Sequence, residues 1–96
     1  MEQEPYLLEF YGEECSHCIA MRDVVLRLEK ELGVEVKKYE VWHNEGNEKL
    51  MLENYKNALE KACGGEIGVP NFYNKKTEKA LCGEVDYDVL KKWAQE

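Results

Sequence analysis

Two cysteines, Cys15 and Cys18, are separated by two residues and follow a short run of apolar residues. A C-x-x-C pair at a junction of a strand and a helix is typical of thiol–disulfide exchange. Free backbone N–H groups and the dipole at a helix N-terminus favour the thiolate, which is the form that attacks disulfides. We therefore predict that Cys15 is the nucleophile and that Cys18, one turn into the helix, is the resolving thiol.

Two titratable residues accompany this pair. His17 lies between the cysteines, and as an imidazolium it would favour the thiolate and make the pair a stronger oxidant. The alternative is an exposed polar residue in a helical turn. Glu9 lies within an apolar strand, where burial would raise its pKa and let it move protons for Cys18. The alternative for Glu9 is a carboxylate on the outer face of an edge strand.

Two carboxylates, Glu13 and Glu14, directly precede Cys15. Negative charge at this place opposes thiolate formation and would select basic or neutral partners. The alternative is a solvated, charged turn with no role in the reaction.

Two further cysteines, Cys63 and Cys82, have three possible uses. Both could be buried free thiols, which is a common fate of unpaired cysteine. They could form a second redox pair that relays electrons. All four cysteines could instead bind zinc or an iron–sulfur cluster, although a second C-x-x-C is absent.

Glycines and prolines divide the chain into the elements that must position these residues. We expect strands at 6–11, 34–42, 69–74 and 78–83, and helices at 16–32, from Asn44 or Asn47 to about Ala62, and at 87–94 after an N-cap at Asp86. A helix joins the first two strands, so they should run parallel, whereas the last two should form an antiparallel hairpin. The order β-α-β-α-β-β-α predicts an α/β fold with a mixed four-stranded sheet and helices on both faces. We expect Trp42 among the core aromatics and His43 in a surface loop.

Length and charge limit the function further. The 96 residues suit a single domain spanning 1–96, and the net charge of −7 disfavours nucleic acid and anionic membranes as partners. No apolar run is long enough to cross a membrane, and the acidic N-terminus lacks the features of a secretory signal. We therefore expect a cytoplasmic protein, in which cysteines serve catalysis or metal binding rather than a disulfide framework.

The segment from Leu7 to Cys18 resembles the active-site segment of the thioredoxin superfamily. The Glu before Phe-Tyr and the His in the spacer look most like the catalytic domains of protein disulfide isomerase. Val69-Pro70 resembles the superfamily's cis-proline, and Leu81-Cys82-Gly83 resembles its closing strand and glycine. The resemblance implies a thioredoxin-like three-layer sandwich and covers nearly the whole chain.

The resemblance also implies roles for single residues. Glu9 matches a buried proton carrier, and a cis peptide bond is expected before Pro70. Val69, Pro70 and Gly83 would lie beside the cysteines and bind an extended peptide. The implied protein is a monomer without a bound cofactor or metal, which exchanges disulfides with protein substrates and is served by an unidentified reductase.

Three other functions are compatible with parts of the sequence. A glutathione-dependent, glutaredoxin-like enzyme would suit the short layout from Tyr6 onward, but the usual upstream Lys and spacer Tyr are absent. A four-cysteine zinc or iron–sulfur protein is the second, and a redox-inert scaffold is the third. The intact Cys15–Cys18 spacing argues against a scaffold, because a scaffold does not need it.

Overall fold

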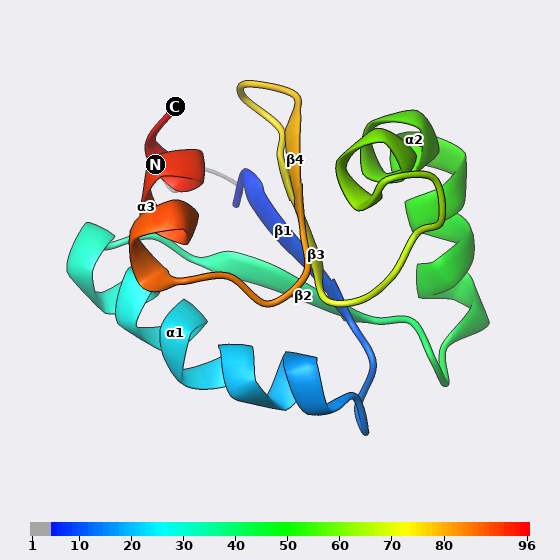
Figure 1. Cartoon of the computed structure of the whole chain (residues 1–96), viewed down its shortest axis with the longest axis horizontal. Coiled ribbons are helices and arrows are strands. Elements are labelled where there is room, and N and C mark those ends of the chain that lie inside the picture. The colour runs from blue at the N-terminus through cyan, green and yellow to red at the C-terminus, as the bar shows by residue number, and fades with distance from the viewer. Residues whose placement is uncertain (1–4) are drawn as a thin grey trace.

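In the computed structural model, which describes residues 5–96, four strands form one mixed sheet and three helices cover its two faces (Figure 1). The strands are β1 (Leu7–Tyr11), β2 (Val36–Glu40), β3 (Asn71–Asn74) and β4 (Lys79–Cys82), and the helices are α1 (Ser16–Leu32), α2 (Glu45–Cys63) and α3 (Tyr87–Gln95). The mixed α/β fold and the four-stranded mixed sheet expected from the sequence are confirmed.

The strands are arranged in the order β2-β1-β3-β4. β1 pairs in parallel with β2 and antiparallel with β3, and β3 pairs antiparallel with β4. β1 is therefore an inner strand, with Glu9 opposite Lys38 on one side and Phe72 on the other. The alternative that placed Glu9 on an edge strand is wrong, because both edges of the sheet are formed by other strands.

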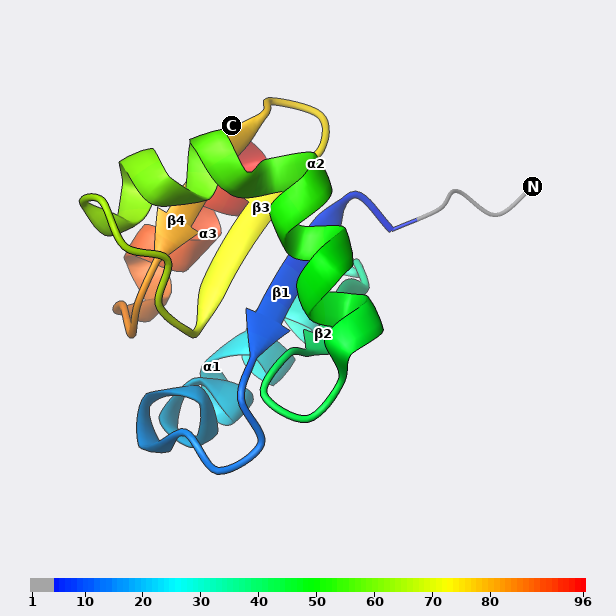
Figure 2. The same ribbon diagram turned by 90° about the vertical axis from the view of Figure 1, so that its right-hand side faces the viewer.

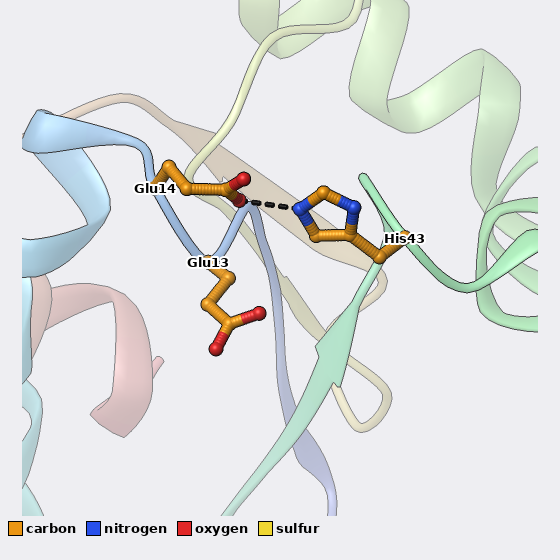
Figure 3. Close-up of side chains that lie close together, drawn as sticks. All are labelled: Glu13, Glu14 and His43. Atoms are coloured by element: carbon orange, nitrogen blue, oxygen red, sulfur yellow. Dashed lines mark hydrogen bonds and ion pairs between the residues drawn. The ribbon is translucent and has the colours of Figure 1, made fainter.

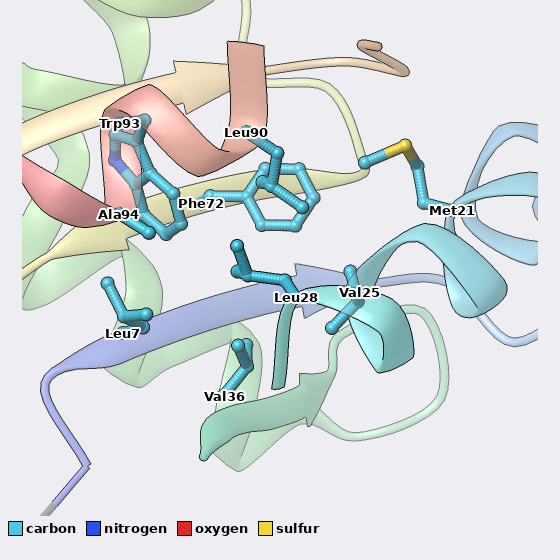
Figure 4. Close-up of a cluster of buried hydrophobic side chains, with 9 residues drawn as sticks. All are labelled: Leu7, Met21, Val25, Leu28, Val36, Phe72, Leu90, Trp93 and Ala94. Atoms are coloured by element: carbon cyan, nitrogen blue, oxygen red, sulfur yellow. The ribbon is translucent and has the colours of Figure 1, made fainter. Parts of the chain in front are cut away.

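Helices α1 and α3 cover one face of the sheet and α2 covers the other, as the two views in Figures 1 and 2 show. The core between the sheet and α1 and α3 is drawn in Figure 4 and consists of Leu7, Met21, Val25, Leu28, Val36, Phe72, Leu90, Trp93 and Ala94. The core under α2 consists of Leu8, Phe10, Val41, Met51, Leu59 and Tyr73. Successive residues of a strand point to opposite faces, so Leu7 and Leu8 supply one side chain to each core.

The ends of the elements differ from the prediction in a few places. The third strand begins at Asn71 rather than at residue 69, because Pro70 has no N–H to give to a ladder. The second strand is shorter at both ends than the predicted 34–42. Asn44 caps α2, since its side chain accepts a hydrogen bond from the Asn47 N–H. Asp86 lies at the N-cap of α3, but its side chain makes no capping hydrogen bond.

The predictions on membranes and targeting concern different parts of the chain. Over residues 5–96, no helix has the length and apolar character that crossing a bilayer requires. Residues 1–4, whose acidity led us to expect no secretory signal, lie outside the described residues.

Candidate active site

Cys15 and Cys18 lie where β1 gives way to α1. Cys15 is the N-cap residue of α1, and Cys18 lies in the first turn of the helix. Both are free thiols, and the exposed fractions are 7% for Cys15 and 3% for Cys18. The Cys15 thiol donates a hydrogen bond to the carbonyl oxygen of Val69 at 3.6 Å. Cys15 also lines an open hollow, which places it at the rim of the site, and Cys18 lies slightly deeper.

The surroundings of Cys18 keep its thiol protonated. Burial, with a smaller contribution from the neighbouring Cys15, raises the pKa of Cys18 to about 12, although the Gly12 N–H donates a hydrogen bond to its sulfur at 3.4 Å and lowers the pKa. A thiol with so high a pKa is a poor attacking group at neutral pH. Cys18 thus needs a base nearby when it attacks a mixed disulfide.

Glu9 supplies a carboxyl group beside Cys18. The two side chains line one cavity of about 420 Å³, together with Tyr11, Arg22, Asp23, Leu26, Glu29 and Lys38. Burial raises the pKa of Glu9 to about 7, although the charge of Lys38 partly offsets this. Glu9 can therefore gain and lose a proton near neutral pH. Sequence reasoning missed Lys38, which reaches the cavity only through the pairing of β2 with β1.

The loop before β3 brings the expected peptide-binding residues to Cys15. The Val69–Pro70 peptide bond is cis, as the resemblance implies. The Val69 carbonyl faces the Cys15 thiol, whereas the Pro70 carbonyl accepts a hydrogen bond from the Gly83 N–H at 2.7 Å. Val69 thus contacts Cys15, and the hydrogen bond from Gly83 anchors the backbone of the loop at Pro70. Their role in binding a peptide stays a prediction.

His17 lies in the first turn of α1. Its Nδ1 lies 2.9 Å from a carboxylate oxygen of Glu84, in the loop after β4, and the imidazole is largely exposed. The structure therefore places His17 at the surface beside the cysteines, and its effect on their reduction potential stays a prediction. Glu84 was missed because nothing local in the sequence links it to His17.

A second polar group consists of Glu13, Glu14 and His43, whose carboxylate oxygens and imidazole nitrogen lie within 4.8 Å of one another (Figure 3). The Nε2 of His43 lies 2.5 Å from a Glu14 oxygen, and this hydrogen bond raises the pKa of His43. Glu40 accepts hydrogen bonds from the backbone N–H groups of Glu13 and His43. These contacts fix the loop after β2 against the loop that carries Cys15.

Trp42 belongs to the same loop and is not a core residue as expected. It is 52% exposed, and its ring lies so close to Gly12 that a Cβ at this position would collide with it. His43, in contrast, is in an exposed loop as expected. Trp42 therefore presents an aromatic surface next to Cys15. No local pattern in the sequence predicts this position.

Cys63 and Cys82 form a disulfide that joins the end of α2 to the end of β4. The alternative that both are free buried thiols is wrong, because the two sulfurs are bonded to each other. Binding of a metal by four thiolates would require this bond to be broken. Cys82 pairs with Asn71 in the sheet, and Asn71 directly follows Pro70 in the chain. Whether the pair relays electrons stays a prediction.

Removing this disulfide should cost stability rather than activity. The 19-residue separation corresponds to a loss of about 3 kcal/mol of unfolding free energy in the double Cys63→Ser, Cys82→Ser variant. Urea unfolding of the oxidised protein and of the variant measures this difference. If the pair relays electrons, the folded variant will instead lose most of its rate of disulfide reduction.

Comparison of the chain with protein-family models finds no match, and comparison with curated proteins finds none. The function therefore has to be argued from the geometry of the site.

Proposed function

We propose that this protein is a thioredoxin-like dithiol–disulfide oxidoreductase that exchanges disulfides with protein substrates through Cys15 and Cys18. One observation carries the proposal. The Cys15 thiol lies at the N-terminus of α1 and against the Val69 carbonyl, with Cys18 and Glu9 directly behind it in one cavity. The layering of α1 and α3 on one face and α2 on the other supports the thioredoxin-like fold.

The reaction runs in two exchanges. The Cys15 thiolate attacks one sulfur of a substrate disulfide, which forms a mixed disulfide and releases the other substrate sulfur as a thiolate that takes up a proton. Cys18 then gives its proton to ionised Glu9 and attacks the Cys15 sulfur. The Cys15–Cys18 disulfide forms and the second substrate sulfur leaves, so the substrate gains two electrons.

The ordering of the two thiols follows from their surroundings. Cys15 lines the open hollow beside Val69, where a protein disulfide can approach it, whereas Cys18 is slightly more deeply buried and faces the cavity that holds Glu9. Glu9, with a pKa of about 7, is a base near neutral pH and shares the cavity of Cys18. His17 tunes the potential of the pair. The protein works as a cytoplasmic monomer without a bound cofactor, and a separate reductase returns it to the dithiol.

The reduction potential of the Cys15–Cys18 pair tests this function. The protein is equilibrated in glutathione or dithiothreitol buffers, its thiols are alkylated, and the product masses are measured. We expect a Cys15–Cys18 disulfide with a potential between about −180 and −270 mV. The Cys63→Ser, Cys82→Ser variant simplifies the masses, because only one disulfide can then form. The proposal fails if no Cys15–Cys18 disulfide forms under any of these conditions.

A further inference from the structure

Cys15 lies at a groove made of two connected hollows. The first, of about 560 Å³, is lined by Glu14, Cys15, Ser16, His17, Val41, Trp42, Glu48, Met51, Ile67, Gly68 and Val69. The second, of about 450 Å³, is lined by His17, Val69, Gly83, Glu84, Val85 and Asp86. Because His17 and Val69 line both, the hollows form one groove that passes Cys15, which we name the acidic groove.

The charges along the acidic groove have one sign. Glu14 and Glu48 line the first hollow, and Glu84 and Asp86 line the second. The chain has 13 lysines and arginines, yet within the described residues 5–96 none of them lines either hollow. The basic groups at the groove are imidazoles that pair with Glu84 and Glu14 and offset part of the charge. The groove therefore carries a net negative potential.

The lining of the first hollow also includes apolar side chains. Trp42, Ile67 and Val69 line it beside the carboxylates. The Trp42 ring is held against the Gly12 backbone, so its exposed face keeps its position near Cys15. Aromatic surfaces of this kind bind apolar or cationic side chains well.

We propose that the substrates are protein segments in which lysine or arginine and an apolar residue flank the disulfide. This inference rests on the proposed function and names its substrate class. The apolar residue contacts Trp42, and the cationic side chains face Glu14, Glu48 and Glu84. Attraction over this range speeds association and is screened by salt. The same field disfavours oxidised glutathione, which is an anion.

Disulfide-bonded peptides of one sequence, with lysine, glutamine or glutamate at the flanking positions, test the proposal. The reduced protein should act on the lysine peptide with a kcat/KM about tenfold above that for the glutamate peptide at low salt, and the ratio should shrink in 0.5 M salt at a Debye length below about 5 Å. The double variant Glu14→Gln, Glu48→Gln should lose most of this ratio. The matched control Glu35→Gln, Glu53→Gln removes the same charge from exposed sites outside the groove and should keep it.

The outcomes separate this inference from the function beneath it. Equal kcat/KM for the three peptides, or a lysine preference that the Glu14→Gln, Glu48→Gln variant retains, overturns the proposed substrate class and leaves the oxidoreductase intact. Faster turnover of oxidised glutathione than of the lysine peptide also overturns it. A protein that exchanges with no peptide and forms no Cys15–Cys18 disulfide lacks the proposed function itself.

Discussion

Replacing Cys15 by serine should lower the rate of disulfide exchange at least about a thousandfold, because a serine hydroxyl is not ionised at neutral pH. Replacing Cys18 by serine should instead leave the first exchange intact and trap the mixed disulfide between Cys15 and the substrate. The two variants remove the same atom type from neighbouring positions, so their contrast reports the order of the two steps. Rates of protein-disulfide reduction, and intact masses under non-reducing conditions, measure both effects.

The structure gives the reason for this asymmetry. Cys15 lines the open hollow against Val69, whereas Cys18 is slightly more deeply buried and its pKa is raised to about 12. The Cys63→Ser, Cys82→Ser variant is the matched control, since it loses two sulfurs outside this site and should keep its turnover. A stable adduct on Cys18 in the Cys15→Ser variant, formed as fast as the adduct on Cys15, would show that the roles are reversed.

The parts of the site that could be predicted from the sequence are those set by local rules. A strand, a glycine and a helix start place Cys15 at an N-cap, and helical spacing places Cys18 one turn later. An apolar run with one carboxylate predicts that Glu9 is buried, and it is 5% exposed. The position of Val69 and Pro70 beside Cys15 came from the resemblance, because no local rule brings residues so far apart together.

The parts that could not be predicted depend on contacts between distant segments. Lys38 meets Glu9 through strand register, and Trp42 meets Gly12 through the course of the loop after β2. Four cysteines allow three pairings into two disulfides, and composition does not choose among them. The packing of α2 against β4 makes that choice for Cys63 and Cys82.

Glu9→Gln should change the pH dependence of stability. The pKa of Glu9 is raised from 4.5 to about 7 in the folded protein, so the folded state holds its proton more tightly than the unfolded chain. Stability from this group is therefore full below about pH 4.5, falls as the pH rises toward 7, and stays low above it. The contribution of Glu9 to the free energy of unfolding falls by about 3 kcal/mol between low and high pH. Glu9→Gln should remove this pH dependence. Urea unfolding between pH 4.5 and pH 8 measures this, with exposed Glu35→Gln as the control of equal charge.

The same variant should slow the release of substrate from the mixed disulfide about a hundredfold at pH 7, because Cys18 would lose its base. The two measurements answer different questions. Burial alone accounts for the stability profile, whereas only proton transfer to Glu9 accounts for slower release. If Glu9→Gln flattens the stability profile but releases substrate at the wild-type rate, Glu9 is a buried acid without a part in the reaction. If release slows in the variant, and the release rate of the wild-type protein falls at low pH with a pKa near 7, Glu9 accepts the proton of Cys18.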